Sequence, residues 1–293
     1  IWGHIHVTGW AITNLPAGEV RDFFNDSEVF NAALFGAAYT DSGYWPQSGE
    51  LERKSREYSE HSHWEPFIQD FVTWIIENDP PPWDTLESKK RVAFLIGVAS
   101  HGLQDEVFDS LFLEQVENND GGGQDVADPG TDGFMAIDEH IRFVPTPYYP
   151  LDTLLELYEG LNEEITADVI ERSVGIMTRL YVGPAGFAIA ESLGNSYSED
   201  IPWTRDHYLD PDIPGSLRAE IGPTRAYIQA VWDRLHGTFD ASHPIVAAYP
   251  ESGRVLRSGN AGSIDATVTF IFGEGVHYDS ARTSWRDQGG EVL

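Results

Sequence analysis

Residues 88–116, which include the run RVAFLIGVASHGLQDEVFDSLFLEQ, constrain the fold more than any other segment. Apolar side chains recur there with the helical period, so the segment predicts a long and largely buried helix. His101, Asp105 and Asp109 follow at intervals of four residues, which places them along one stripe of that helix. Unpaired charges are costly inside a protein, and a bound cation would compensate them. The alternative is a helix whose acidic positions face water and whose histidine is satisfied in the core.

Helical periodicity continues through most of the first 240 residues, and prolines and glycines interrupt it at intervals. Further helices are expected over residues 7–12, 27–38, 65–78, 132–142, 151–162, 167–180 and 215–235. After about Pro244 the composition shifts to Gly, Ser and alternating apolar residues. In this part every second residue is apolar at Ala266, Val268, Phe270 and Phe272, as on one face of an extended strand. We therefore expect a mainly α fold, with a helical domain over residues 1–243. Residues 244–293 are expected to form a small β-rich appendage or the start of a further domain.

Composition limits the function classes. The chain has no cysteine, so histidines and carboxylates are its strong candidate metal ligands. A formal net charge of −30 would repel polyanions, so no nucleic acid partner is expected. No apolar run is long enough to span a membrane, which leaves at most peripheral membrane contact. The chain begins with Ile1 rather than Met, which suggests a removed N-terminal segment and a secreted or periplasmic location.

A second polar cluster, Asp128-Pro129-Gly130-Thr131-Asp132, follows a glycine-rich loop. The segment has two interpretations. Its acids are candidate metal ligands, but an Asp N-cap, a Pro at the first helical position and an acid in the first turn also explain it as helix initiation. Scattered further candidates are His4, His6, Asp41, His61 and His63.

Four segments, GAAYTDSGYW, SEHSHWEPF, WIIENDPPPW and KRVAFLIGVASHGLQDEVFDSLFLEQ, resemble the zinc-dependent phospholipase C family, and within it the glycosylphosphatidylinositol-specific phospholipases D. The resemblance covers roughly residues 2–143, and more weakly the helices up to about residue 240. It is shared more distantly with the single-strand-specific zinc nucleases. It implies a phospholipase C and zinc nuclease-like helical bundle that holds two or three zinc ions.

The resemblance also implies a ligand set. The matching positions are His4, Asp41, His63, His101, Asp105, Asp109, Asp128 and Asp132. Among them Asp41 matches the aspartate that bridges metals or acts as general base, whereas His6 looks incidental. A terminal residue of the family, often Trp, also ligates metal, but here Ile1 precedes Trp2. Close relatives carry histidine where this chain has Asp109 and Asp128, and that exchange raises the preference for harder ions such as Mn, Mg or Ca.

The expected function is a metal-dependent phosphodiester hydrolase of the phospholipase C or D type, with a metal-bridging hydroxide as nucleophile and a small-molecule or lipid phosphodiester as substrate. Three alternatives stay open at this point. The His-to-Asp exchanges are also compatible with a non-catalytic, calcium-stabilised binding domain. A nuclease-like phosphodiesterase is disfavoured by the negative charge. A metal-dependent enzyme acting on another kind of bond has no particular signal in the sequence.

Overall fold

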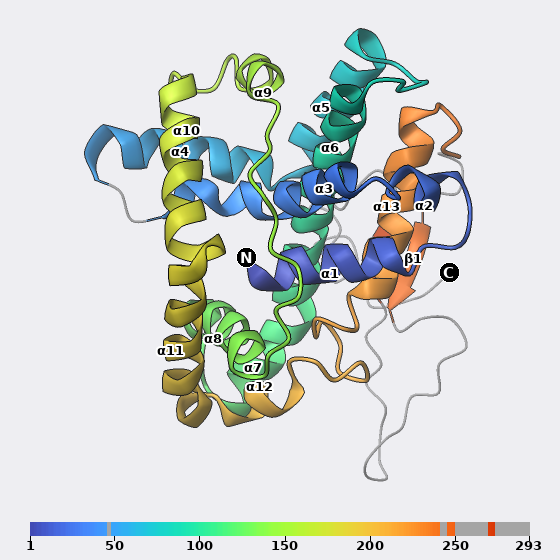
Figure 1. Cartoon of the computed structure of the whole chain (residues 1–293). Helices are drawn as coiled ribbons and strands as arrows, with labels where there is room; N and C mark the ends of the chain where they lie inside the picture. Colours follow the sequence, from blue (N-terminus) through green and yellow to red (C-terminus); the bar gives the residue numbers. More distant parts are fainter. Residues whose placement is uncertain (46–47, 241–244, 250–268, 273–293) are drawn as a thin grey trace, which may run out of the picture.

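A computed structural model describes residues 1–45, 48–240, 245–249 and 269–272, and confirms the mainly α fold (Figure 1). Its helices are α1 (Trp2–Thr13), α2 (Glu19–Phe23), α3 (Ser27–Tyr39), α4 (Gly49–Ser62), α5 (Glu65–Asn78), α6 (Leu86–Val107), α7 (Leu113–Asn119), α8 (Gln124–Ile137), α9 (Leu151–Leu157), α10 (Ala167–Met177), α11 (Pro184–Asp200), α12 (Pro202–His207) and α13 (Ile221–Leu235). Three short helical segments join them: η1 (Thr40–Tyr44, 3₁₀), η2 (Phe108–Phe112, π) and η3 (Thr178–Val182, π).

Several helix boundaries differ from the sequence-based prediction, and two of these differences bear on the candidate site. The helix expected over residues 88–116 is interrupted after α6 by the π-helical turn η2, which changes the direction of the side chains that follow. The second difference concerns α8, which begins at Gln124 and carries Pro129 in its interior. The interpretation of Asp128 and Pro129 as the start of a helix is therefore wrong, because Gly123 occupies the N-cap position instead.

The core of the molecule depends on close packing between α3 and α6, which cross at Gly36 and Gly97. A Cβ atom on Gly97 would lie 2.0 Å from the carbonyl oxygen of Ala33, and one on Gly36 would lie 2.3 Å from that of Phe94. Neither position tolerates a side chain at this helix separation. The contact brings the middle of α6 against the end of α3, directly before η1.

Helix α1 is buried along most of its length and packs against α3, α6 and α13. Figure 1 shows its N-terminal end lying between an upper group of helices, which includes α3 and α4, and a lower group, which includes α7, α8 and α12. Within the lower group α8 packs closely on α11, where Gly133 faces Gly194. The start of α1 thus lies where the two groups meet.

Two strands, β1 (Ile245–Tyr249) and β2 (Thr269–Phe272), pair antiparallel, and β1 packs against α13. In the register Ala248 pairs with Phe270 and Tyr249 with Thr269. The expected strand positions Phe270 and Phe272 therefore fall in β2, whereas Ala266 and Val268 lie outside the described residues. The domain boundary at residue 243 stays a prediction.

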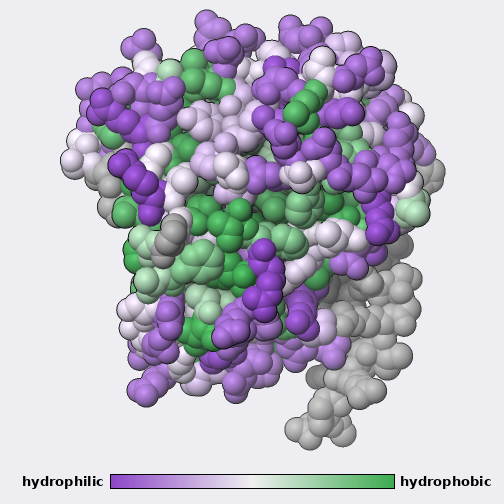
Figure 2. Space-filling model, in the orientation of Figure 1, coloured by the Kyte–Doolittle hydropathy of each residue, from purple (hydrophilic) through white to green (hydrophobic). Residues whose placement is uncertain are grey.

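The face shown in Figure 2 is hydrophilic above and below, and a band of apolar residues crosses its middle. Among the described residues, the large apolar side chains that stay exposed are Ile76, Leu86, Val144, Leu180 and Ile189. In the same part of the chain, no helix combines the length and the apolar character needed to cross a bilayer.

Candidate metal centre

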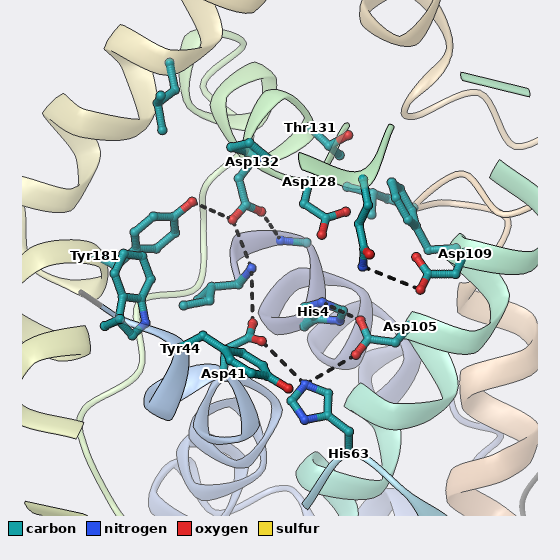
Figure 3. Close-up of a pocket in the computed structure, with 18 of the residues that line it drawn as sticks. His4, Asp41, Tyr44, His63, Asp105, Asp109, Asp128, Thr131, Asp132 and Tyr181 are labelled. Carbon is teal, nitrogen blue, oxygen red and sulfur yellow. Dashed lines mark hydrogen bonds and ion pairs between the residues drawn. The ribbon is translucent and has the colours of Figure 1, made fainter. Parts of the chain in front are cut away.

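A cavity of about 700 Å³ opens at the N-terminal end of α1. Eight elements contribute to its wall, namely α1, η1, α4, α6, η2, α8, η3 and α11. Residues that follow η1 and α4 and residues that precede α13 complete it. Of the eight residues that the sequence predicted as ligands, seven line it: His4, Asp41, His63, Asp105, Asp109, Asp128 and Asp132. The eighth, His101, is fully buried behind them. The structure thus brings together predicted ligands that are up to 128 positions apart in the sequence, from His4 to Asp132 (Figure 3).

Three imidazoles are held in one orientation by bonds behind them. The Nδ1 atom of His63 lies 2.6 Å from the carbonyl oxygen of Ser59, and that of His101 lies 2.7 Å from the carbonyl oxygen of Ala37. A carbonyl oxygen only accepts, so each Nδ1 carries a hydrogen, and each Nε2 is the ring atom left to face the cluster. The His4 ring stacks on the His101 ring with centroids 3.9 Å apart, and its Nδ1 atom lies 3.1 Å from Oε1 of Gln104. All three Nε2 atoms then face carboxylates.

Two carboxylates complete the cluster. Asp105 places Oδ2 at 3.1 Å from Nε2 of His101 and 3.5 Å from Nε2 of His63, while its Oδ1 atom lies 3.2 Å from Nε2 of His4. Asp41 places Oδ1 at 3.6 Å and 3.7 Å from Nε2 of His63 and His101 respectively. Two sets of ligand atoms in the described residues are close enough to share an ion: His4 with His101 and Asp105, and Asp41 with His63 and His101.

The charges in this cluster depend on each other. Burial lowers the pKa of His63, but the carboxylates of Asp41 and Asp105 outweigh that effect and raise it to about 9. Burial would raise the pKa of Asp105, but the His101 and His4 imidazoles lower it to about 2. For His4, burial and the neighbouring His101 ring lower the pKa to about 4. His63 therefore carries the proton that holds the two carboxylates together.

Asp132 anchors the start of α1. Its Oδ2 atom accepts from the Ile1 amine at 2.9 Å and from the Tyr181 hydroxyl at 2.8 Å, and its Oδ1 atom accepts from the Gly3 N–H at 2.9 Å. Burial would raise the pKa of Asp132, but the amine and the Gly3 N–H outweigh it and keep the pKa below its usual range. The Ile1 nitrogen also lies 3.8 Å from Oδ2 of Asp41. The Ile1 amine thus lies between the carboxylate of Asp132 on α8 and that of Asp41 on η1.

Asp109 and Asp128 line the cavity apart from the compact cluster. The π-turn η2 begins just before Asp109, whose Oδ2 atom lies 3.5 Å from Nε2 of Gln124. His101 and Asp105 lie one turn apart on α6, as the sequence predicted. Asp109 lies in the π-helical turn η2 and therefore does not continue the same stripe. Asp128 is open to solvent on one side, and desolvation on the other, together with the charges of Asp105 and Asp109, raises its pKa.

The two histidines that the sequence set aside have other partners. The Nδ1 atom of His6 bonds to the carbonyl oxygen of Trp2, and its Nε2 atom accepts from the backbone N–H groups of Arg142 and Phe143. His61 packs edge-on against the ring of Phe67. Neither residue lines the cavity, so His6 is a structural tie between α1 and the segment after α8.

Sequence reasoning missed several cavity residues. Aromatic and apolar side chains form part of the cavity wall, and they include Tyr44, Trp45, Trp64, Tyr181, Ile189, Leu193 and Leu217. Glu60 accepts from the Tyr44 hydroxyl at 2.7 Å and from the Trp64 indole N–H at 3.0 Å, which fixes two of these rings. Glu220 and Thr131 add buried polar groups. Thr131 stands in the predicted polar cluster, and Tyr44, Trp45 and Trp64 stand in the segments that carry the resemblance, but none of them was predicted as a site residue. The remaining residues lie outside every segment that the sequence marked.

The donor set suits a cation. The Nε2 atom of His101 is buried and faces carboxylate oxygens of Asp105 at 3.1 Å and of Asp41 at 3.7 Å. Backbone bonds behind coordinating imidazoles are the usual arrangement that orients them. Three imidazoles and two carboxylates are the ligand types of zinc sites, while the oxygen-only pair Asp109 and Asp128 suits harder ions.

Comparisons with known proteins find relatives of one kind. The chain is similar to phosphatidylinositol-glycan-specific phospholipases D. The human relative is 34% identical over 205 residues, the rat relative 29% over 205 residues and the Dictyostelium discoideum relative 28% over 205 residues. These alignments cover 64–65% of this chain but only 20–24% of each relative, so the chain spans about a quarter of their length or less. No protein-family profile and no solved structure matches the chain.

Proposed function

We propose that this chain is a metal-dependent phosphodiester hydrolase that acts on lipid-linked substrates. The observation that carries the proposal is the convergence of His4, His63 and His101 on the carboxylates of Asp41 and Asp105, at distances of 3.1–3.7 Å. The similarity to enzymes named for phosphatidylinositol-glycan cleavage gives the substrate class. An extracytoplasmic location remains a prediction.

Two cation positions follow from the cluster. His4, His101 and Asp105 would hold one ion, and Asp41, His63 and His101 would hold another, with Asp105 facing both sets. Asp109, Asp128 and Asp132 are the candidates for a third. Zinc is the first expectation for the histidine-rich positions, and Mn, Mg or Ca are the alternatives for the carboxylate-rich one. Cations bound here would lower the pKa of a water molecule and neutralise charge on the phosphoryl oxygens.

The chain's own residues then position the reactants. Burial works against ionisation of Asp41, but His101, His63 and the Ile1 amine outweigh it, so the pKa of Asp41 lies well below its usual range. An ionised Asp41 accepts a hydrogen bond from the attacking water and orients it, which is the role assigned to it here. Tyr44 and Trp64, fixed by Glu60, limit the access of bulk water from that side of the cavity.

The cavity wall supports an amphipathic substrate. Ile189, Leu193 and Leu217 line the cavity together with the carboxylates of Asp105 and Asp128. A phosphodiester between an apolar and a polar group would find side chains of both kinds in this cavity. Long nucleic acids are a poorer fit, because the net charge of −30 repels polyanions.

Turnover measurements test this proposal. The purified chain is stripped with a chelator, reloaded with zinc, manganese, magnesium or calcium singly, and offered phosphatidylinositol vesicles, a glycosylphosphatidylinositol-anchored reporter and a single-stranded oligonucleotide. Cleavage of a lipid phosphodiester that depends on an added transition metal supports the proposal, and the lipid product distinguishes C-type from D-type cleavage. Turnover of the oligonucleotide alone would favour a nuclease. Calcium binding without turnover on any substrate would favour the binding domain and overturn the enzyme.

A further inference from the structure

Glu220 is a buried carboxyl group in the wall of the cavity that the metal cluster does not use. It is the residue directly before α13, and 2% of its surface is exposed. Its Oε1 atom has no hydrogen-bond partner in the described residues. It belongs to neither set of ligand atoms that lie close enough to share an ion. A buried acid at a reaction cavity without a partner calls for another role.

The surroundings of Glu220 favour its neutral form. The charged groups that act on it most are the carboxylates of Asp105 and Asp109, and like charges disfavour ionisation. Burial contributes more than either carboxylate, and all three effects raise the pKa of Glu220 well above its usual range. Cations at Asp105 and Asp109 would weaken the two Coulombic effects but would not remove the burial. Glu220 therefore holds a proton that it can donate.

Its backbone is firmly placed. The N–H of Glu220 donates to the carbonyl oxygen of Ser216 at 3.1 Å, and its own carbonyl oxygen accepts from the N–H of Thr224 at 2.9 Å. Helix α13 packs against α1 and α6, which carry His4 and His101. Asp41, which orients the water, reaches the cavity from η1 and thus from a different element. A displacement at phosphorus needs a water-orienting group and a proton donor at separate positions, and Asp41 and Glu220 reach the same cavity from separate elements.

We infer that Glu220 is the general acid that protonates the leaving oxygen. This inference rests on the proposed hydrolase function. Water oxygen forms the new bond to phosphorus as the bond from phosphorus to the leaving oxygen breaks. The leaving oxygen takes the proton of the Glu220 carboxyl and departs as an alcohol, and Glu220 is left as a carboxylate. The proton lost by the attacking water passes to solvent, and solvent reprotonates Glu220, so each turnover consumes one water molecule.

Leaving-group dependence tests the inference. A poor leaving group, such as an alkyl alcohol, needs the proton, whereas p-nitrophenolate leaves without it. In Glu220→Gln we expect kcat/KM to fall roughly 10²–10⁴-fold for a phosphodiester with an alkyl leaving group, and less than about threefold for bis(p-nitrophenyl) phosphate. Metal content should equal that of the wild-type chain. Glu60→Gln, the same change at the exposed rim, should affect both substrates alike.

An equal loss on both substrates, no loss on either, or a loss of metal in Glu220→Gln would overturn the role of Glu220 while leaving the proposed function intact. If the wild-type chain hydrolyses neither substrate with any metal, the proposed function itself fails. A second measurement needs no variant: across a series of alkyl and aryl leaving groups, kcat/KM of the wild-type chain should depend only weakly on the acidity of the leaving alcohol. A steep dependence would contradict proton donation.

Discussion

The Nε2 atom of His101 lies 3.1 Å from Oδ2 of Asp105, which stands one turn further along α6. The other oxygen of the same carboxylate faces His4 at 3.2 Å. Asp105 therefore connects the imidazole of α1 with that of α6, and its Oδ2 atom also reaches His63 at 3.5 Å. No other carboxylate in the described residues pairs with all three imidazoles, which makes Asp105 the centre of the cluster.

Asp105→Asn should reduce both metal content and turnover while the helical circular-dichroism signal stays near wild type. Loss of residues that merely support a ligand costs about 10–100-fold, so loss of this carboxylate charge should cost at least about 100-fold in kcat/KM. Asp70→Asn, an exposed change on α5, is the matched control and should leave both quantities unchanged. Wild-type metal content in Asp105→Asn would remove Asp105 from the site.

Substitutions of His6 and His101 should have different effects, because His6 has a structural role and His101 is a candidate metal ligand. His6→Ala leaves the N–H groups of Arg142 and Phe143 without their acceptor, so it should lower the free energy of unfolding by about 1–3 kcal/mol. Its metal content per folded chain should stay at the wild-type value. His101→Ala should instead lose metal. Urea unfolding and elemental analysis of both variants check this, and the reverse pattern would exchange the two roles.

The stability of the metal-free chain should fall as the pH rises from about 6.5 to about 9. The pKa of His63 is raised from 6.5 to about 9 in the folded state, so its protonated form stabilises the fold fully below pH 6.5, and that contribution is lost as the pH passes 9. The shift corresponds to about 3 kcal/mol. The Ile1 amine, raised to about 10, acts in the same direction above pH 8.

Chemical unfolding of chelator-treated protein across this pH range measures the effect. His63→Gln lacks the titrating imidazole and should show a shallower decline than the parent chain. His4 does not contribute to this decline in stability. Its pKa is lowered in the folded state, so its titration affects stability only below pH 6.5. Stability that is constant or increasing from pH 6.5 to 9 in the parent chain would show that His63 does not carry the proton between Asp41 and Asp105.

The sequence predicted the helices whose apolar pattern is strong and whose ends are marked. Residues 65–78 were expected as a helix and form α5, because apolar positions at Phe67, Ile68, Phe71 and Ile75 follow the helical period. Helix α4 (Gly49–Ser62) was missed, since its charged surface carries few apolar residues. The π-turn at η2 was also missed, because nothing in the apolar pattern distinguishes an extra residue in a turn from a continuous helix.

The contact between α3 and α6 should not accept a methyl group. Gly97→Ala would place Cβ 2.0 Å from the Ala33 carbonyl oxygen, so we expect a loss of about 1–3 kcal/mol or more in the free energy of unfolding. Gly175→Ala, inside α10 with no atom closer than 4.0 Å, should instead be neutral or stabilising by up to about 1 kcal/mol. Thermal unfolding compares the two, and equal midpoints would contradict the close helix packing.

The sequence predicted part of the candidate site. His101 and Asp105 share a helix, so their spacing alone places them together, whereas resemblance was needed to add His4, Asp41 and His63 from remote positions. Glu220 and Tyr181 were out of reach for both methods. Their side chains enter the cavity because η3 and the start of α13 pack near the start of α1, and long-range packing of that kind leaves no local pattern.

Elemental analysis of the purified chain, combined with anomalous scattering from its crystals, shows whether the cluster is a metal centre. We expect at least two metal ions per chain, located between the imidazoles of His4, His63 and His101 and the carboxylates of Asp41 and Asp105. A chain that binds no metal after equilibration with zinc, manganese, magnesium and calcium, or that binds it away from these five side chains, would rule out a metal centre at this cluster.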